Sequence, residues 1–357
     1  MKIHLVGGFL GSGKTTAIMT AAKEFIRNGK RVGIITNDQG KYLVDTAFFS
    51  LNQIPAVEVT GGCFCCNYHQ LDDQLELLIE TARPDAIFAE SVGSCADLVA
   101  TVMRPMQQIR KMNPENTTFS VFSDSRLLRL RLLDEPLPFS EDVVYIFDKQ
   151  LEEAGLVVLN KIDLLSNERR DELIGLFRRM YPDKPYIIQN SLDSSQIGDW
   201  LAKLEQAKGS DFLQMLDIDY QRYGDGEALL AWVDEEAALS VNPESAQQVV
   251  INLIQQILNQ LAAQSAGIGH LKIIIQTDSG AEKISFPAIE QPGWEEMIPG
   301  SRDGKVRVLI NARVEMSAEK LKQLIESAIA SQVSQYSIGS TSAFHPQAPH
   351  PTYRLSA

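Results

Sequence analysis

Residues 8–15 read GFLGSGKT, and the architecture of the first half of the chain can be worked out from this octapeptide. It matches the pattern G-x-x-x-x-G-K-S/T, follows a β-branched apolar run at residues 3–6, and precedes a helical pattern that ends at Asn28-Gly29. A glycine-rich turn at a helix N-terminus lets backbone N–H groups surround phosphate oxygens, with the positive end of the helix dipole behind them. The stretch therefore predicts a phosphate-binding loop inside a nucleotide-binding domain.

Individual residues of this loop have expected tasks. Lys14 is expected to meet the β- and γ-phosphates, and the Thr15 hydroxyl is expected to ligate Mg²⁺. The other phosphate contacts are assigned to residues of the loop and of the first helical turn, namely Gly8, Gly11, Ser12, Gly13 and Thr16. A glycine-rich turn without a ligand is the competing interpretation, and the flanking strand and helix patterns disfavour it.

A second signature, Asn160-Lys161-Ile162-Asp163, follows a buried-strand pattern at residues 156–160. The Asp163 carboxylate can accept hydrogen bonds from both the ring N–H and the exocyclic amine of guanine, whereas adenine has an acceptor at that ring position and lacks that amine. Ser191 follows another strand pattern and is expected to support the guanine oxygen through its backbone. The sequence therefore predicts GTP rather than ATP as the nucleotide.

Acidic residues follow two other predicted strands. Asp45 lies in the segment after the second strand pattern, and Glu90 directly follows the fourth. Loops beyond the carboxyl ends of the strands meet at one edge of an open α/β sheet, so both carboxylates are expected to reach Mg²⁺ or its waters, although either alone is more often an ordinary loop residue. Gly93 is a candidate γ-phosphate sensor, because glycine lets the backbone approach closely and reorient. Lys14, Asp45, Glu90 and Gly93 are thus the expected catalytic residues.

Three of the four cysteines crowd into Cys63-Phe64-Cys65-Cys66. Thiolates are soft ligands for Zn²⁺, Cu⁺ or similar ions, and this spacing lets at least two of them face one ion. The cluster therefore indicates metal binding, with a buried thiol cluster or a redox pair as alternatives. Cys95 is either a further thiol of this region or a small core residue, and His69 is either a nitrogen ligand or a surface residue.

Short β-branched runs alternate with helical patterns up to residue 216, which predicts a doubly wound, mostly parallel α/β sheet for residues 1–216. Its strands are expected at residues 3–6, 32–36, 57–59, 86–89, 119–123, 156–160 and 186–189. A break at residues 216–226 precedes a smaller α+β domain over residues 226–335, with strands expected at 228–233, 271–276 and 306–312 and helices at 243–263 and from Ser317. Residues 336–357, rich in Pro and Ser, are expected to form a loosely held tail.

Composition excludes several classes of protein. The 357 residues contain 44% apolar and 22% charged side chains, and no apolar run approaches the ~20 residues of a membrane span. A net charge of −13 disfavours nucleic acid as a partner, and Arg126, Arg129 and Arg131 are interpreted as a solvated or nucleotide-facing edge. Because a phosphate-binding loop stands where a signal peptide would be cleaved, we expect a cytoplasmic protein.

The chain resembles the CobW-like GTPases, which are related to the nickel chaperones of hydrogenase and urease and to the chaperones of cobalamin-dependent mutases. The resemblance is carried by GFLGSGKTT, residues 37–45, GGCFCC, the E-x-x-G of Glu90 to Gly93, QLEEA at 150–154 and LNKID, and it extends to a small second domain. It implies a GTP-hydrolysing metallochaperone whose cysteines hold an ion, often zinc with cobalt or nickel as alternatives, and pass it to a client protein. It also implies a GTP-dependent homodimer.

The first switch departs from the family pattern E-N-E-F-G-E, because residues 36–41 read TNDQGK. Two acids are missing and Lys41 adds a positive charge, which opposes a divalent ion, so either thiolates alone hold the ion or metal handling is altered. His345 and His350 in the tail are interpreted as metal or partner contacts, or as part of a mobile Pro-rich segment. The competing functions are an assembly or reactivation factor for a corrinoid or other cofactor enzyme, with structural cysteines, and a small-molecule kinase, which the N-K-x-D motif disfavours.

Overall fold

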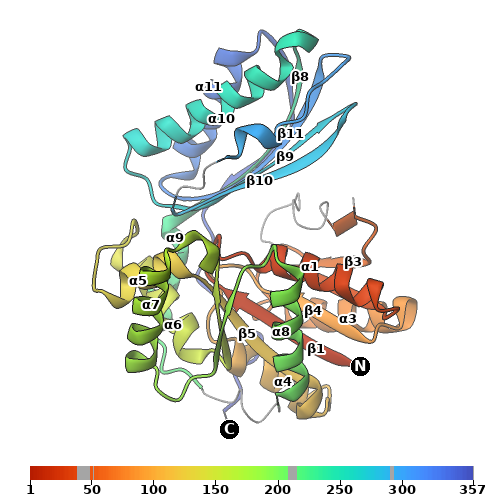
Figure 1. Ribbon diagram of the computed structural model, residues 1–357, viewed down its shortest axis with the longest axis vertical. Helices are drawn as coiled ribbons and strands as arrows, with labels where there is room; N and C mark the ends of the chain where they lie inside the picture. The colour runs from red at the N-terminus through yellow and green to blue at the C-terminus, as the bar shows by residue number, and fades with distance from the viewer. Residues whose placement is uncertain (38–48, 51, 208–214, 290–292, 357) are drawn as a thin grey trace. The chain divides into compact units, whose positions relative to one another are not determined.

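The computed structural model describes residues 1–37, 49–50, 52–207, 215–289 and 293–356, which form two compact units (Figure 1). The described residues of the first unit come from Met1–Gln39, Asp45–Gly226 and Ala348–Ala357, and those of the second come from Glu227–Gln347. The last residues of the chain therefore belong to the same unit as the first.

A parallel sheet forms the centre of the first unit. Its seven strands, counted within the described residues, lie in the order β3-β2-β4-β1-β5-β6-β7. Their bounds are β1 (Lys2–Gly8), β2 (Val32–Asn37), β3 (Ala56–Val59), β4 (Ala86–Glu90), β5 (Thr117–Asp124), β6 (Leu156–Asn160) and β7 (Tyr186–Gln189). The seven expected strands are confirmed. β1 lies between β4 and β5, with Val6 paired to both Glu90 and Ser120, so the loops after these strands meet around the glycine-rich loop.

Helices flank this sheet. The described α-helices are α1 (Lys14–Arg27), α3 (Tyr68–Ala82), α4 (Arg104–Gln108), α5 (Ser125–Leu132), α6 (Glu141–Glu153), α7 (Asn167–Met180) and α8 (Ser194–Gln206). A π-helix, η1 (Val99–Met103), and two 3-10 helices, η2 (Pro114–Asn116) and η3 (Ile162–Leu164), are also present. Helical spacing of apolar residues explains their packing: α1 buries Ala17, Ile18, Ala21, Ala22 and Phe25 on one stripe. Helices on the sheet exclude water from both faces, and every residue of β4, β5 and β6 is buried as a result.

The second unit is an antiparallel sheet whose described strands lie in the order β10-β9-β11-β8-β12. Its elements are α9 (Tyr220–Leu229), which begins in the first unit, β8 (Leu230–Ser240), η5 (Pro243–Ser245), α10 (Ala246–Ala263), β9 (Ile268–Thr277), β10 (Gly280–Pro287), η6 (Glu295–Met297), β11 (Lys305–Glu315), α11 (Ala318–Gln332) and β12 (Gln335–Phe344). Helices α10 and α11 lie side by side on the sheet (Figure 1). The expected cap of α11 is present, because the Ser317 hydroxyl accepts a hydrogen bond from the Lys320 N–H.

Two expectations for the second half of the chain are wrong. The first strand of the second unit starts at Leu230 rather than at residue 228, because α9 continues to Leu229. Residues 336–344 form most of the edge strand β12 instead of a loose tail. An edge strand buries few of its side chains, so it does not need apolar residues at every second position. The serines and the glycine of β12 therefore lack the alternation of apolar and polar residues that identifies a strand in the sequence. None of the helices in the described ranges is long and apolar enough to cross a bilayer.

Candidate functional site

The glycines of the loop at residues 8–15 are required by its backbone. Gly8, Gly11 and Gly13 have φ angles of 125°, 70° and 95°, which favour glycine. A Cβ on Gly8 would lie 2.1 Å from the Phe122 carbonyl oxygen, and one on Gly13 would lie 2.3 Å from Nδ2 of Asn160. The loop therefore fits against β5 and β6 only without side chains at these positions.

The polar residues of this loop point into it. The Lys14 ammonium donates to the carbonyl oxygens of Gly8 at 2.6 Å and Phe9 at 3.3 Å, and Lys14 is buried. The Ser12 hydroxyl is also buried and has no hydrogen-bond partner among the described residues. Thr16 lies on the first turn of α1, as expected. A buried ammonium and a buried hydroxyl on a turn at the N-terminus of a helix form a suitable receptor for phosphate oxygens.

Thr15 and Glu90 lie together at the end of β4. The Thr15 hydroxyl donates to Oε1 of Glu90 at 2.8 Å, and both side chains are buried. A hydroxyl and a carboxylate oxygen are ligands that Mg²⁺ takes in nucleotide sites, so these two residues fit that ion. Asp45, the other expected acidic ligand, lies outside the described residues.

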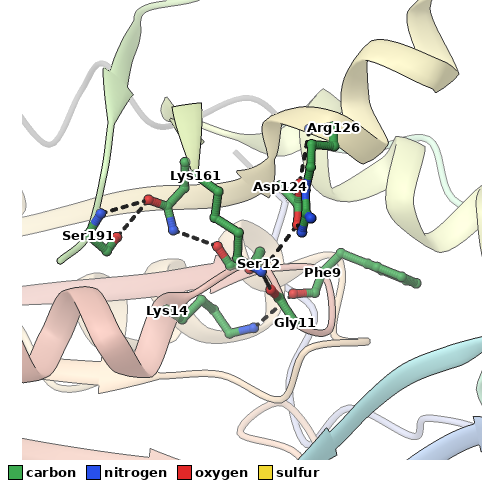
Figure 2. A network of polar contacts seen from close by, with 9 residues as sticks. Phe9, Gly11, Ser12, Lys14, Asp124, Arg126, Lys161 and Ser191 are labelled. Carbon is green, nitrogen blue, oxygen red and sulfur yellow. Dashed lines mark hydrogen bonds and ion pairs between the residues drawn. The ribbon is translucent and has the colours of Figure 1, made fainter. Parts of the chain in front are cut away.

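The N-K-x-D motif is joined to the glycine-rich loop by a network of hydrogen bonds (Figure 2). Asn160 donates through Nδ2 to the Ser12 carbonyl at 2.7 Å and accepts through Oδ1 from the backbone and hydroxyl of Ser191, at 3.1 and 2.7 Å. Lys161, at a φ of 59°, donates through Nζ to the Gly11 carbonyl at 2.7 Å. The loops after β6 and β7 are thereby held against the phosphate-binding loop. Asp163 lies exposed on η3, accessible to a base.

Asp124, at the end of β5, is part of this network and was not expected from the sequence. Its Oδ2 lies 3.2 Å from Lys161 Nζ and 2.7 Å from Arg126 Nη2 (Figure 2). Burial opposes ionisation of Asp124, but the hydrogen bonds and charge of Arg126 and the charge of Lys161 outweigh it and hold its pKa below the usual value. The available signal was an acid followed by Ser-Arg at a strand end, the pattern of a helix N-cap. Arg129 and Arg131 instead form ion pairs with Glu172 and Asp148.

The loop after β4 lies against the phosphate-binding loop. A Cβ on Gly93 would come within 3.0 Å of the backbone N and Cα of Leu10, so this close approach needs glycine. Gln150 of α6 donates through Nε2 to the carbonyls of Gly93 and Cys95, at 3.0 and 2.9 Å. Residues 91–97, called the sensing loop from here on, are thus held between the nucleotide site and α6. Gln150 was expected only as part of the family pattern, without a role.

The three clustered cysteines bring their sulfurs together. Cys63 Sγ lies 2.7 Å from Cys65 Sγ and 3.3 Å from Cys66 Sγ, and the other two are 3.7 Å apart. Cys63 and Cys65 are buried, Cys66 is half-buried, and none of the chain's four cysteines, all of them described, forms a disulfide. Tetrahedral zinc at about 2.3 Å from each thiolate keeps sulfurs about 3.8 Å apart, so small shifts accommodate an ion. The donors therefore fit Zn²⁺ or another soft cation.

Cys95 of the sensing loop contacts this cluster. The hydrogen bonds that Cys63 makes with Cys65, Cys66 and Cys95, in decreasing order of effect, lower the pKa of Cys63 well below its usual value despite burial. The hydrogen bond to Cys63 and burial raise the pKa of Cys66 to about 12. A metal ion bound by these sulfurs would displace the protons of the thiols. Cys95 belongs to the thiol region.

Asn37, at the end of β2, holds the loop that carries the cysteines. Its Nδ2 donates to the carbonyls of Gly62 at 2.8 Å and Val59 at 3.2 Å, and its Oδ1 accepts from the Phe64 N–H at 2.8 Å. The sequence showed Asn37 only as part of the first switch. Thr36 is buried in β2, and residues 38–41 of that switch, including Lys41, lie outside the described residues.

The histidines lie in different places. His345, in the second unit, accepts from the Ala318 N–H at 3.1 Å and lies 2.6 Å from the Ala228 carbonyl, so it joins the start of α11 to α9. His69 is exposed on α3, and His350 is exposed with its backbone N–H donating to Cys66 Sγ at 3.3 Å. Neither ring nitrogen belongs to the group of close ligand atoms, which among the described residues contains the three cysteines.

Known proteins resemble the part of the chain that carries the nucleotide and thiol sites. The sequence profile described as CobW/HypB/UreG, nucleotide-binding domain, matches residues 2–188. The zinc chaperone CobW of Sinorhizobium sp is 30% identical over 183 residues, with 45% of this chain and 51% of that protein covered. The zinc chaperone YeiR of Escherichia coli strain K12 is 31% identical over 179 residues, with 48% and 50% covered. The chain spans about half the length of these curated relatives.

Among solved structures, HypB from Helicobacter pylori in complex with nickel is similar at 14% identity and a TM-score of 0.44. The similar region covers 61% of this chain and 91% of that one.

Proposed function

Because the chain belongs to the CobW/HypB/UreG family of nucleotide-binding proteins, we propose that it hydrolyses GTP and uses the cycle to hold and release a transition-metal ion. The ion is held by Cys63, Cys65 and Cys66, and zinc is the first candidate, with cobalt and nickel as alternatives. Two relatives named as zinc chaperones support this order. The acceptor is a client metalloprotein, and the chain's free thiols suit the reducing cytoplasm.

GTP binds at the carboxyl edge of the sheet. Lys14 leaves the carbonyls of Gly8 and Phe9 for the β- and γ-phosphates, and the guanine donates to Asp163. Thr15 and Glu90, with Asp45, hold Mg²⁺, which neutralises phosphate charge when bound. Water then forms a bond to the γ-phosphorus while the bond from phosphorus to the bridging oxygen breaks, leaving GDP and phosphate.

The single observation that carries the gating proposal is the position of the sensing loop between the two sites. Gly93 lies against Leu10 of the phosphate-binding loop, and two residues later the Cys95 thiol contacts Cys63. A loop that moves when the γ-phosphate leaves therefore changes the surroundings of a metal ligand. Two nucleotide states with different metal affinities are what transfer to a client requires.

Metal content in defined nucleotide states tests this function. Pure reduced protein is incubated with zinc, cobalt or nickel and with GTPγS or GDP, desalted, and assayed for bound metal beside Cys65→Ser. We expect about one ion per chain in the wild type, a difference in affinity between the two nucleotides, and little metal in Cys65→Ser. Binding below about a tenth of an ion per chain in every state contradicts the proposal.

The alternative function is GTP-dependent assembly or reactivation of a cofactor enzyme, with structural cysteines. It is favoured by one observation: the thiols of Cys63, Cys65 and Cys66 already satisfy one another by hydrogen bonds. It predicts metal-free protein that still changes state with GTP. Sedimentation with GTPγS and GDP also tests whether two copies pair around the nucleotide, which we propose from the family resemblance.

A further inference from the structure

The end of the chain lies on the thiol loop. The Thr352 N–H donates to the Cys65 carbonyl at 2.8 Å, and its hydroxyl donates to the Cys66 carbonyl, also at 2.8 Å. The His350 N–H donates to Cys66 Sγ at 3.3 Å. The Tyr353 ring meets Tyr68 edge-on, with centroids 5.4 Å apart. Residues 348–356, called the C-terminal clasp from here on, therefore contact the half-buried sulfur of the cluster.

The same clasp is tied to the sensing loop. Arg354 Nε donates to Oδ2 of Asp97 at 2.7 Å, its Nη2 donates to the Leu216 carbonyl at 3.1 Å, and the Leu355 N–H donates to the Ala100 carbonyl at 3.0 Å. Asp97 is fully buried, and the Tyr220 hydroxyl also donates to its Oδ2 at 2.7 Å. A buried carboxylate without such partners costs free energy. Separating Arg354 from Asp97 is therefore unfavourable, and we expect Arg354 and the sensing loop to move together.

We propose that the C-terminal clasp is a positioning element of the thiol site, and that the ion pair between Arg354 and Asp97 makes its position depend on the sensing loop. The proposal rests on the proposed function, in which this loop responds to the γ-phosphate. Asp97 lies four residues after Gly93, and the clasp contacts Cys65 and Cys66, whereas Cys95 contacts Cys63. The sensing loop thus reaches all three metal ligands, one directly and two through the clasp.

The contact with Cys66 has a chemical consequence. An N–H donated to a thiolate stabilises its negative charge and orients its lone pairs toward an ion, and outer partners of this kind tune metal affinity. When the clasp lies on the cluster, Cys66 is oriented and its sulfur is covered. When the clasp lifts, Cys66 loses this donor and becomes accessible to an incoming ligand from a client. Release of the metal ion is thereby coupled to exposure of the Cys66 sulfur.

Zinc affinity in two nucleotide states tests the clasp. Full-length wild type, Arg354→Gln, Arg354→Lys and Arg307→Gln are titrated with zinc against a chromophoric chelator, in GTPγS and in GDP. Arg307 pairs with Glu236 within the second unit at 2.7 Å and provides a matched control. We expect Arg354→Gln to weaken the tighter state about ten- to a hundredfold and to bring the ratio of the two affinities toward one. Arg354→Lys should keep part of the ratio, and Arg307→Gln all of it.

A second pair of variants isolates the contact with Cys66. His350→Pro removes the N–H that is donated to the sulfur, whereas His350→Ala keeps it. Zinc affinity should fall in His350→Pro and stay near the wild-type value in His350→Ala. Equal effects of the two substitutions overturn the N–H contact as the cause. These variants also keep the proposal testable if Arg354→Gln does not fold.

The failures of the two proposals are distinguishable. Wild type that binds zinc with a nucleotide-dependent affinity, together with unchanged affinities in both nucleotide states of Arg354→Gln, overturns the clasp and leaves the proposed function intact. An equal loss of affinity in both nucleotide states of Arg354→Gln overturns the link between the clasp and the sensing loop. Wild type that binds no zinc in either state contradicts the proposed function, and the clasp with it.

Discussion

The two halves of the carboxyl edge of the parallel sheet are built in different ways. In the nucleotide half, Asn160 and Lys161 donate directly to carbonyls of the phosphate-binding loop, so two short motifs hold each other in place. In the thiol half, the cysteine loop is held by Asn37 from β2, by Cys95 from the sensing loop and by the C-terminal clasp. One half is held by its own motifs and the other by segments from elsewhere in the chain.

This difference fits the two proposed tasks, which are nucleotide binding in one half and the holding and release of a metal ion in the other. A nucleotide pocket that is ordered before its ligand arrives loses little conformational entropy on binding. Under the proposed function, the metal site needs two arrangements of similar free energy, and we propose that lifting of the C-terminal clasp provides the second one. We therefore expect substitutions in the nucleotide half to abolish binding or hydrolysis, and those in the thiol half to alter affinities more gradually.

The largest effect is expected for Lys14→Ala. Removing the ammonium leaves the developing charge on the phosphates without its main cationic partner, and GTP hydrolysis should fall by about 10²–10³-fold or more. Phosphate release measured with saturating GTP checks this result. Lys149→Ala, which removes an ion pair with Glu152 on α6, is the control and should hydrolyse normally. Hydrolysis retained in Lys14→Ala would show that residues 8–15 do not perform the assigned role.

Asp163→Asn should change the base that is recognised. An amide cannot accept both guanine donors, so GTP affinity should fall roughly 10- to 100-fold, which corresponds to hydrogen bonds with a charged group worth about 1.5–3 kcal/mol. Xanthosine triphosphate, which has a carbonyl in place of the amine, should bind better than to the wild type. Fluorescent-nucleotide competition measures both affinities, with the exposed Asp171→Asn of α7 as control. Unchanged GTP affinity would remove Asp163 from the site.

Asn37→Ala tests the thiol half alone. Three hydrogen bonds that hold the cysteine loop are lost, and zinc affinity should fall about tenfold while GTP affinity stays close to the wild-type value. Asn113→Ala removes an asparagine whose side chain accepts from the Glu115 N–H at η2, far along the chain, and should change neither affinity. If Asn37→Ala lost both affinities together, the two halves would not be separable.

The smallest effect on either site is expected from His4 on β1, between the two halves. Burial, and to a lesser extent the charge of Lys2, lower its pKa from 6.5 to about 3, so the folded state keeps it neutral with Nδ1 at 2.7 Å from the Thr118 hydroxyl. The unfolded chain takes up a proton below pH 6.5. The contribution of His4 to stability is therefore complete above pH 6.5 and is lost as pH falls toward 3.

Urea unfolding at several pH values checks this expectation. Between pH 6 and 4 the free energy of unfolding should fall with a slope that approaches about 1.4 kcal/mol per pH unit from this one group. His4→Gln should be less stable at pH 7.5 but should show a shallower slope. An identical slope in both proteins would mean that His4 titrates normally in the folded chain.

Some functional residues could not be found from the sequence, and they share one property. Gln150, Asn37 and Arg354 act through partners far along the chain, and so does Asp124 in its ion pair with Lys161, so no spacing rule connects these residues to a motif. The ion pair of Arg354 with Asp97 joins residues 257 positions apart, and the His350 N–H meets a sulfur 284 positions away. Strand β12 was missed for a related reason, because an edge strand of small polar residues is defined by its pairing with β8 rather than by its own periodicity.

By itself, the sequence determined the seven-stranded parallel sheet, the glycine-rich loop and the N-K-x-D motif of this protein, because contiguous residues carry the backbone conformation and side-chain spacing that these features need. It also identified the three cysteines as one group. Only the tertiary structure decided that Cys95 and the C-terminal clasp join that group, that Thr15 meets Glu90, and that Asp124 and Asn37 support the two halves. Each of these depends on segments that fold next to one another while remaining far apart in the chain, and such contacts leave no pattern in either segment.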